Sequence, residues 1–413
     1  MKYLINIGGE IPHAGLKNIN IPLNGRNLII TGKNGSGKTS FLNKLFESIN
    51  ADLDSLNDNK QQYKNNINHW NSQIHELGPS NPESQHLKNL VNDYQGRLKL
   101  LESNFIIETI NFEAFKNKYK GYKAIFRKFE AMREINIVES TQTTLSTAEV
   151  EMARNAFRQN LGNRLEQHLV NLKTSEAFAK GIEQDEIKGK KFEDWFNSFE
   201  ISLKKLFENS ETKLIFKNEN RKFAIYNGKT YSNFQTLSSG YKAIFDIFAD
   251  LLLRTEFFDI TPSELEGIVL IDEIDAHLHI SLQKLILPFL IESFPSIQFI
   301  VSTHSPFVIT STNEDTVVYD ISSREFFEED LSLYSHESII KEMFHVKDDN
   351  EQLEKLSAQL IHFIESKEST ANLNAIQTLL DEINKDFEKL SVDLQLQYMV
   401  AKNKLAKLKH EGN

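Results

Sequence analysis

The chain has 413 residues, of which 40% are hydrophobic and 25% charged, so it is longer than one compact domain needs and can bury a sizeable core. Its formal net charge of -11 disfavours generic nucleic-acid binding, although a local basic patch can still exist. The absence of cysteine excludes disulfides, zinc–thiolate sites and thiol nucleophiles. No apolar run is long enough to span a membrane and no signal peptide is evident, so we expect a cytoplasmic protein with no membrane partner.

The first part of the chain predicts three short strands followed by a helix. The strands are expected at 4–7, 18–23 and 27–32, with turns at Gly8-Gly9 and Asn24-Gly25. The glycine-rich segment after the third strand leads into an amphipathic helix with apolar residues in steps of three and four.

Residues 51–103 have a different pattern. Apolar residues in 53–77 and 87–105 alternate steps of three and four, as in heptads, and Pro82 suits the first position of a return helix. The pattern predicts an antiparallel coiled-coil hairpin that projects from the protein. The alternative is two ordinary amphipathic helices folded on the core.

The remaining chain alternates helices and strands. The predicted elements are strand structure at 123–138, one long helix from Ser146 to Leu172, a helix over 192–206, strands at 213–216 and 222–226, a helix after Gly240, buried strands at 268–271 and 297–304, a last strand at 316–321 and charged helices from about 339 to the end.

A phosphate-binding loop is predicted between the third strand and its helix, because residues 32–39 match G-x-x-x-x-G-K-S/T in full. Its glycines let backbone N–H groups surround phosphate oxygens, Lys38 reaches the β- and γ-phosphates, and the Thr39 hydroxyl ligates Mg²⁺. The alternative is a chance glycine-rich turn. The predicted cofactor-binding residues of this segment are Gly32, Lys33, Asn34, Gly35, Ser36, Gly37, Lys38, Thr39 and Ser40.

Two carboxylates follow the buried strand at 268–271 directly. Asp272 is expected to complete the Mg²⁺ shell with Thr39, and Glu273 to act as the catalytic group that polarises the attacking water. The alternative is an acidic pair that caps a helix after a core strand.

Two further segments suit phosphate contacts. Ser238, Ser239 and Gly240 open a helix, where hydroxyls and free N–H groups bind anions, although Ser-Ser-Gly is also a common loop. His304 ends the strand at 297–304 and is expected to contact the γ-phosphate as a second catalytic residue, although a lone histidine is more often structural.

In this order the motifs resemble ABC-type ATPases, in particular the SMC/RecF/OLD-like branch. The resemblance implies ATP and Mg²⁺ as cofactors and two sites between two heads, each between one subunit's phosphate-binding loop and the other's Ser238–Gly240. It also implies that Asp275 is the aspartate that crosses the dimer interface, and it makes Gln142 a candidate for the Q-loop glutamine.

The stretch from Leu270 to Ile309 also resembles ATPase subunits of bacterial anti-phage defence systems of the Septu, PARIS and OLD types. Tyr241 and Ile280 depart from residues common at these positions, which puts the subfamily in doubt. The sequence lacks the acidic cluster of a Toprim nuclease and any His-Asn-His pattern. We therefore expect the chain to carry the ATPase and a separate protein, a nuclease or toxin, to carry the effector.

The predicted fold class is α/β: an ABC-type P-loop ATPase head with an inserted antiparallel coiled-coil hairpin, a helical subdomain and a helical C-terminal region. The predicted domains are 1–50 and 104–140 for the first part of the head, 51–103 for the hairpin, 141–211 for the helical subdomain, 212–338 for the rest of the head and 339–413 for the C-terminal region, which is either a partner-docking surface or a cap on the head.

The sequence thus predicts an oligomeric ATP-hydrolysing subunit of a defence complex, which senses infection and controls its effector. The rival interpretation is a DNA-repair ATPase that clamps DNA with its arm, which keeps DNA as a candidate partner. A scaffold that binds ATP and turns it over negligibly is a further variant.

Overall fold

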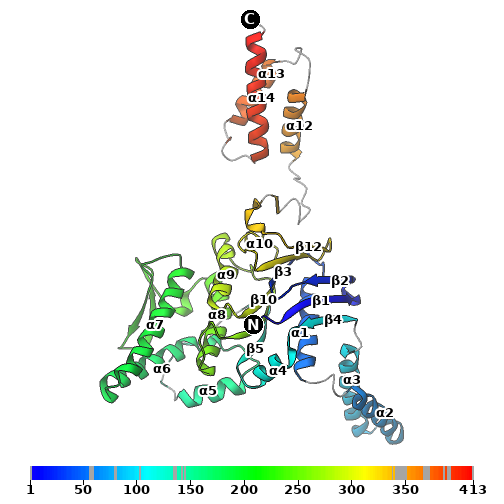
Figure 1. Cartoon of the computed structure of the whole chain (residues 1–413), viewed down its shortest axis with the longest axis vertical. Coiled ribbons are helices and arrows are strands. Elements are labelled where there is room, and N and C mark those ends of the chain that lie inside the picture. Colours follow the sequence, from blue (N-terminus) through cyan, green and yellow to red (C-terminus); the bar gives the residue numbers. More distant parts are fainter. Residues whose placement is uncertain are drawn as a thin grey trace. The chain divides into compact units, whose positions relative to one another are not determined.

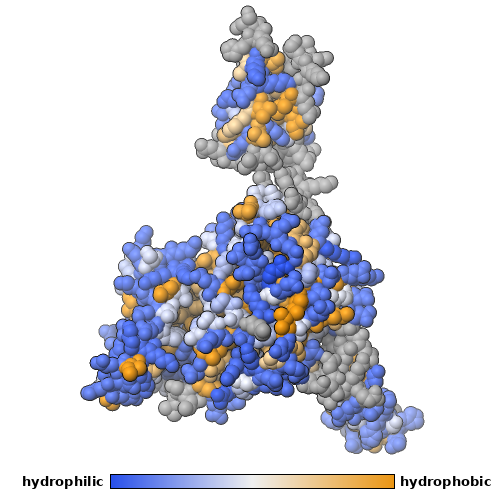
Figure 2. All heavy atoms as spheres, viewed as in Figure 1, coloured by the Kyte–Doolittle hydropathy of each residue, from blue (hydrophilic) through white to orange (hydrophobic). Residues whose placement is uncertain are grey.

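The computed structural model describes residues 2–54, 60–78, 81–101, 104–133, 137–140, 143, 146–336, 338–339, 351–365, 373–384, 387 and 392–411. These residues fall into two compact units, Met1–His336 and Glu337–Asn413, and the division lies beside the predicted boundary at 338/339. On the visible face of the first unit, hydrophilic side chains predominate and hydrophobic patches are scattered (Figure 2).

A six-stranded sheet forms the centre of the first unit (Figure 1), in the order β12-β11-β3-β10-β9-β5. All neighbouring pairs are parallel except β11 and β12, which are antiparallel. Strands β3 and β10 are buried along their whole length, which explains why most of their residues are apolar. The sheet confirms the α/β class. The strands are β3 (Asn27–Thr31), β5 (Ala124–Phe129), β9 (Glu266–Ile271), β10 (Ile297–Ser302), β11 (Thr316–Asp320) and β12 (Glu325–Phe327).

A second sheet is three-stranded and antiparallel, in the order β2-β1-β4, with the first strand of the chain in the middle. The strands are β1 (Leu4–Ile11), β2 (Leu16–Pro22) and β4 (Phe105–Thr109), with the short helix η1 (Pro12–Ala14) between β1 and β2. The predicted turn at Gly8-Gly9 is wrong, because both glycines lie inside β1. Gly9 has a φ of 107°, and a Cβ there would lie 1.7 Å from the Asn104 carbonyl oxygen. The glycine therefore lets the backbone at Asn104 lie close against β1.

Helices α2 (Lys60–Leu77) and α3 (Pro82–Leu101) pack against each other after α1 (Lys38–Leu53). The Tyr94 ring contacts the edges of Tyr63 and Trp70, at centroid distances of 5.0 and 4.8 Å. Phe105, which the heptad pattern extended into the second helix, instead begins β4 and packs on Phe41. The pair is a helical hairpin, and its coiled-coil character stays a prediction.

The helical subdomain contains α5 (Ser146–Asn155), α6 (Leu165–Phe178) and α7 (Glu186–Leu206). The prediction of one helix from Ser146 to Leu172 is wrong, since the chain leaves the helix after α5 and re-enters it through η3 (Gly162–Arg164). A Cβ on Gly162 would lie 3.1 Å from the Asp246 carbonyl oxygen, so this turn packs tightly on the next helix layer. Apolar periodicity alone does not reveal such a break.

The rest of the first unit follows the predicted order with additions. Strand structure predicted over 123–138 is limited to β5 among the described residues, and the strand at 316–321 is not the last, because β12 follows it. The other elements are α4 (Phe112–Lys120), β6 (Lys213–Lys217), β7 (Lys222–Tyr226), β8 (Tyr231–Ser232), α8 (Ser239–Phe258), α9 (Ile280–Ser293) and α10 (Pro306–Ile309).

The second unit contains α12 (Glu351–Glu365), α13 (Leu373–Asn384) and α14 (Val392–Glu411). Its apolar residues pack on one another, so much of the surface considered for partner docking forms this unit's own core. Within the basic end, Lys404 Nζ donates to the Phe363 carbonyl at 2.7 Å. Across the described residues of both units, no helix is long and apolar enough to cross a bilayer. The core of the second unit consists of Leu360, Phe363, Leu380, Ile383, Leu394, Tyr398, Ala401 and Leu405.

Candidate functional site

Three neighbouring parallel strands, β3, β10 and β9, lead into predicted site residues at one edge of the central sheet. Strand β3 leads into residues 32–39, β9 into Asp272 and β10, which lies between them, into His304. Ligands of open parallel sheets bind at the carboxyl ends of the strands. The edge therefore collects groups that are far apart in the sequence.

The loop between β3 and α1 has the backbone of a phosphate cradle. Gly32, Gly35 and Gly37 have positive φ angles of 136, 75 and 99°, a region that favours glycine. A Cβ on Gly32 would lie 2.6 Å from Ser322 Oγ, so no larger residue fits there. Within the described residues, Ser36 Oγ is buried and has no hydrogen-bond partner. The loop thus has an inward-facing hydroxyl and room that only glycines leave open, which fits an anionic ligand.

Lys38 is the first residue of α1, and its side chain lies within this loop. It is 6% exposed, and its Nζ donates to the carbonyls of Gly32 and Lys33 at 3.0 and 3.2 Å. Burial lowers the pKa of Lys38, while the nearby carboxylates, led by Glu273, oppose the change. The ammonium is placed against the loop backbone, and Thr39 beside it is exposed.

The Ser302 hydroxyl on β10 holds the acidic turn after β9. Ser302 Oγ donates to Asp272 Oδ1 at 2.5 Å and accepts the Glu273 N–H at 2.8 Å. Asp272 is 2% exposed, and Glu273 has a φ of 43°, so the chain turns sharply between them. The next strand-end residue, Thr303, donates to Asp275 Oδ1 at 2.5 Å. The strand end at 302–303 therefore orients the carboxylates of Asp272 and Asp275 and the backbone of Glu273.

Arg133 is a site residue that the sequence reasoning missed. Its guanidinium donates to the carbonyls of Asp272 and Glu273, both at 2.9 Å, and of Ile274 at 3.3 Å. The side chain is buried behind the turn, where burial lowers its pKa. Only its position a few residues after an apolar strand was visible in the sequence. The arginine fixes the backbone that carries the acidic pair.

His304 follows β10 between the phosphate-binding loop and the acidic turn, and it is half-buried. Burial and then the positive charge of Lys38 lower its pKa, against the opposing effect of Asp275, Glu273 and Asp272. Its imidazole therefore stays neutral at physiological pH, which suits a hydrogen-bonding contact rather than an ion pair.

The start of α8 differs from these groups. Ser238 and Ser239 are exposed, and Ser238 makes no side-chain cap bond to the helix. Gly240 is buried, and a Cβ there would lie 3.2 Å from the His277 carbonyl, so α8 begins against the turn that follows Asp275. Among the described hydrogen bonds, none joins 238–240 to residues 32–40. Gln142 lies outside the described residues.

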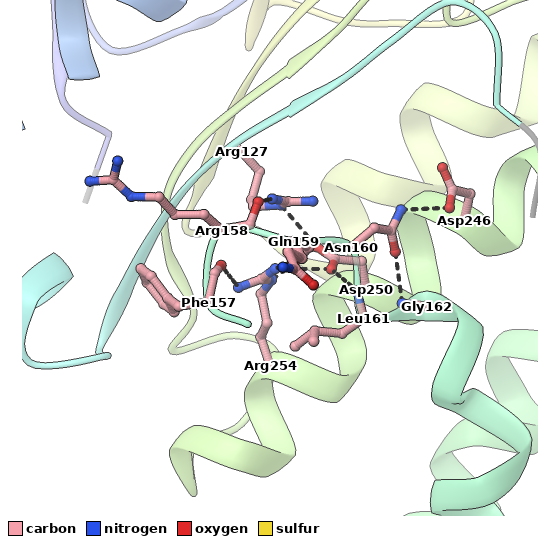
Figure 3. A network of polar contacts seen from close by, with 10 residues as sticks. All are labelled: Arg127, Phe157, Arg158, Gln159, Asn160, Leu161, Gly162, Asp246, Asp250 and Arg254. Atoms are coloured by element: carbon pink, nitrogen blue, oxygen red, sulfur yellow. Dashed lines mark hydrogen bonds and ion pairs between the residues drawn. The ribbon is translucent and has the colours of Figure 1, made fainter. Parts of the chain in front are cut away.

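A buried charge network fixes α8 to the rest of the first unit (Figure 3). Asp250 is fully buried; Arg254 donates to its carboxylate at 2.9 and 3.0 Å, and Arg127 of β5 lies 3.3 Å away. Arg254 also donates to two carbonyls of the loop 157–162, at 2.9 and 2.8 Å. The network explains why the chain leaves the helix before η3: the loop carbonyls bond to a side chain instead.

The strand–loop–helix of residues 27–53, with an acidic pair at the same sheet edge, defines a P-loop nucleotide-binding fold. The chain belongs to the family described as "AAA domain, putative AbiEii toxin, Type IV TA system", whose model matches residues 43–310. The match begins after the phosphate-binding loop, whose assignment rests on its own motif and geometry.

Two kinds of curated relative match the chain. The "Retron Ec83 probable ATPase" of Escherichia coli is 31% identical over 50% of this chain and 40% of its own length. The "Septu protein PtuA" of Bacillus mycoides (strain KBAB4) is 38% identical over 23% of this chain and 13% of its own length. The predicted resemblance to Septu-type ATPases is confirmed, and the alignments span less than half of either relative.

Among solved structures, the SMC head bound to the C-winged helix domain of ScpA is 14% identical, with a TM-score of 0.34 over 77% of this chain and 94% of that one. CbiO1 from Clostridium perfringens, part of the ABC transporter complex CbiONQ, is 12% identical, with a TM-score of 0.31 over 79% of this chain and 86% of that one.

Proposed function

We propose that this chain binds ATP with Mg²⁺ and hydrolyses it to ADP and phosphate. The observation that carries the proposal is the position of Lys38 inside the glycine loop, at the same sheet edge as Asp272 and Glu273. The family and the ATPase named among its relatives support the same activity. The exposed Thr39 hydroxyl and the Asp272 carboxylate fit the oxygen ligands that Mg²⁺ prefers.

Each residue has a separate task in this proposal. Residues 32–40 hold the phosphates, and Lys38 neutralises their charge. Glu273 accepts a hydrogen bond from the attacking water and orients it, and neutral His304 contacts the terminal phosphate. The bound Mg²⁺ would supply charge neutralisation at the phosphates. Catalysis then depends on positioning, which Ser302 and Arg133 provide from behind the turn.

The proposed active form contains two copies of the chain. Ser238 and Ser239 are exposed at a helix start whose N–H groups have no intrahelical partner. A second copy's bound nucleotide would satisfy them, and Asp275 would lie at the same interface. This arrangement makes each site composite, with Lys38 from one copy and Ser239 from the other.

We further propose that the protein serves anti-phage defence, where it controls a separate nuclease or toxin. Support comes from the names of the retron and Septu relatives and from the absence, in the sequence, of a nuclease motif. In this proposal ATP closes the two copies around the effector, and infection changes that state.

The test is a pull-down from cells that carry the native gene neighbourhood, comparing the parent protein with Glu273→Gln in ATP. The substitution removes the water-orienting carboxylate and is expected to trap the ATP-bound state. A nuclease-like protein that copurifies in one state and not in the other is the expected result. Lys38→Ala, which should not bind ATP, is the matched control. DNA retained with no protein partner would overturn effector control and favour a DNA clamp.

A further inference from the structure

A cavity of about 650 Å³ lies in the first unit between α7, α8 and residues 259–264. None of the residues proposed to bind ATP lines it. This volume lies in the range of small-molecule sites, which are mostly apolar with a few placed polar groups. Trp195 and Phe199 stack nearly parallel in its wall, with centroids 5.5 Å apart and an angle of 16°. The aromatic residues that line it are Phe192, Trp195, Phe199, Phe248 and Phe294.

Of the carboxylates that line the cavity, Glu256 is bonded to the aromatic wall. Glu256 of α8 lines the cavity and its side chain is 25% exposed. Its Oε1 accepts the Trp195 indole N–H at 2.5 Å, and its Oε2 lies 3.9 Å from His168 Nε2. No lysine or arginine among the described residues forms an ion pair with it. Burial raises the pKa of Glu256, and the rise outweighs the opposing effects of His168, the Trp195 N–H and Lys191.

The two lysines that line the cavity form their close ion pairs with other carboxylates. Lys188 pairs with Glu183 at 2.8 Å, and Lys191 lies 3.8 Å from Asp259. These lysines therefore have closer carboxylate partners, and among the described residues Glu256 has no lysine or arginine within ion-pair distance. An ammonium group brought by a ligand would supply the missing charge, and aromatic walls favour both flat rings and cations.

From this geometry we propose that the cavity binds a planar aromatic amine in its ammonium form, with the ring between the aromatic walls and the ammonium on Glu256. The cavity touches α8, which begins at Ser239, and residues 259–264, which precede the strand that leads to Asp272. The proposal concerns binding alone, and its test does not depend on ATP hydrolysis.

The test uses Trp195 as the reporter. The sequence has two tryptophans, so Trp70→Phe leaves Trp195 as the only one. Titration with 1-naphthylmethylammonium at mildly alkaline pH should give saturable quenching, and 1-naphthylacetate, an anion of similar size, should bind at least about tenfold more weakly, or about 1.4 kcal/mol. Equal binding of the two probes, or no saturable quenching by either, would overturn the proposal.

Two variants and one control in the Trp70→Phe background locate the probe. Glu256→Gln keeps the size of the side chain and should abolish the preference for the cation. Glu193→Gln, on the same helix as Trp195 but outside the lining, should leave both affinities unchanged. Ser198→Phe places a ring in the cavity from an exposed, lining position and should block both probes. Unchanged cation binding in both Glu256→Gln and Ser198→Phe would show that the probe binds elsewhere.

Discussion

The loop at residues 32–39 and the start of α8 both present a helix N-terminus, yet their surroundings are opposite. At the loop, Lys38 is buried and bonded to carbonyls, and the facing carboxylates are held by neighbouring strand ends. At α8, Ser238 and Ser239 are exposed, and neither helix has a side-chain bond at its N-cap. The first terminus is surrounded by charged groups of its own chain, and the second is open to solvent.

The difference is informative because both termini carry free N–H groups that favour anions. A helix terminus that is already surrounded by groups of its own chain is preorganised to bind a ligand without a second copy. The open terminus lies against the turn that follows Asp275, on a helix that a buried charge network holds in place, and among the described residues no hydrogen bond joins it to the phosphate-binding loop of its own chain. The difference thus favours a site assembled from two copies, with the loop at residues 32–39 from one copy and the start of α8 from the other.

The largest effect is expected at the first terminus, in the loop at residues 32–39. Lys38→Ala removes the ammonium from the loop, and we expect ATP turnover to fall by at least about 100-fold, with weakened nucleotide binding. Phosphate release and binding of a fluorescent ATP analogue measure the two effects. Lys123→Ala, at an exposed position after α4, is the matched control and should behave like the parent. Parental turnover in Lys38→Ala would contradict the assignment of the loop.

The open terminus gives the second prediction. Ser239→Arg adds a bulky side chain at an exposed position, so the fold should tolerate it while turnover falls by about tenfold or more. ATP binding to Lys38 of the same copy should persist. If the site is composite, mixing this variant with Lys38→Ala should give a distinct result.

Mixing Lys38→Ala with Ser239→Arg should restore turnover, because each mixed dimer contains one site with both an intact loop and an intact Ser239. Each variant mixed with itself is the control. Failure of the mixture, with mixed dimers verified by differently tagged copies, would place both halves of the site in one chain and remove the reason for a dimer.

A smaller effect is expected from the support behind the acidic turn. Arg133→Lys keeps the charge but cannot span three carbonyls with a single ammonium, so Glu273 loses its fixed position. We expect kcat to fall by about tenfold with little change in ATP affinity. A role in stability alone would lower the unfolding midpoint and leave kcat of the folded enzyme unchanged.

The sequence predicted what is encoded locally and missed what is assembled across the chain. Residues 32–39 and Asp272 lie at strand ends as expected, because a short motif after an apolar strand specifies both. Arg133 and Ser302 had no local signature, since their partners are distant in the sequence. For the same reason the loop 157–162, whose carbonyls bond to a residue almost a hundred positions away, was read as helix.

Within α8 itself, Asp246 gives the smallest and most pH-specific prediction. Its carboxylate accepts from Asn160 Nδ2 at 2.6 Å, and burial raises its pKa to about 6 despite Arg133 and Arg127, while Asp250 adds to the rise. A raised carboxyl pKa means that the folded state disfavours the charge. The resulting loss of stability is absent below the unfolded pKa, grows as the pH rises from about 4 to 6, and is complete above that.

Asp246→Asn is therefore expected to raise the free energy of unfolding by on the order of 1 to 2 kcal/mol at about pH 8, with the gain disappearing near pH 4. Denaturant unfolding at both pH values measures it. Asp315→Asn, at an exposed site, should change stability little at either pH. A loss of stability at pH 8 in Asp246→Asn would mean that this carboxylate is a stabilising partner of the arginines, so that α8 is anchored through Asp246 as well as Asp250.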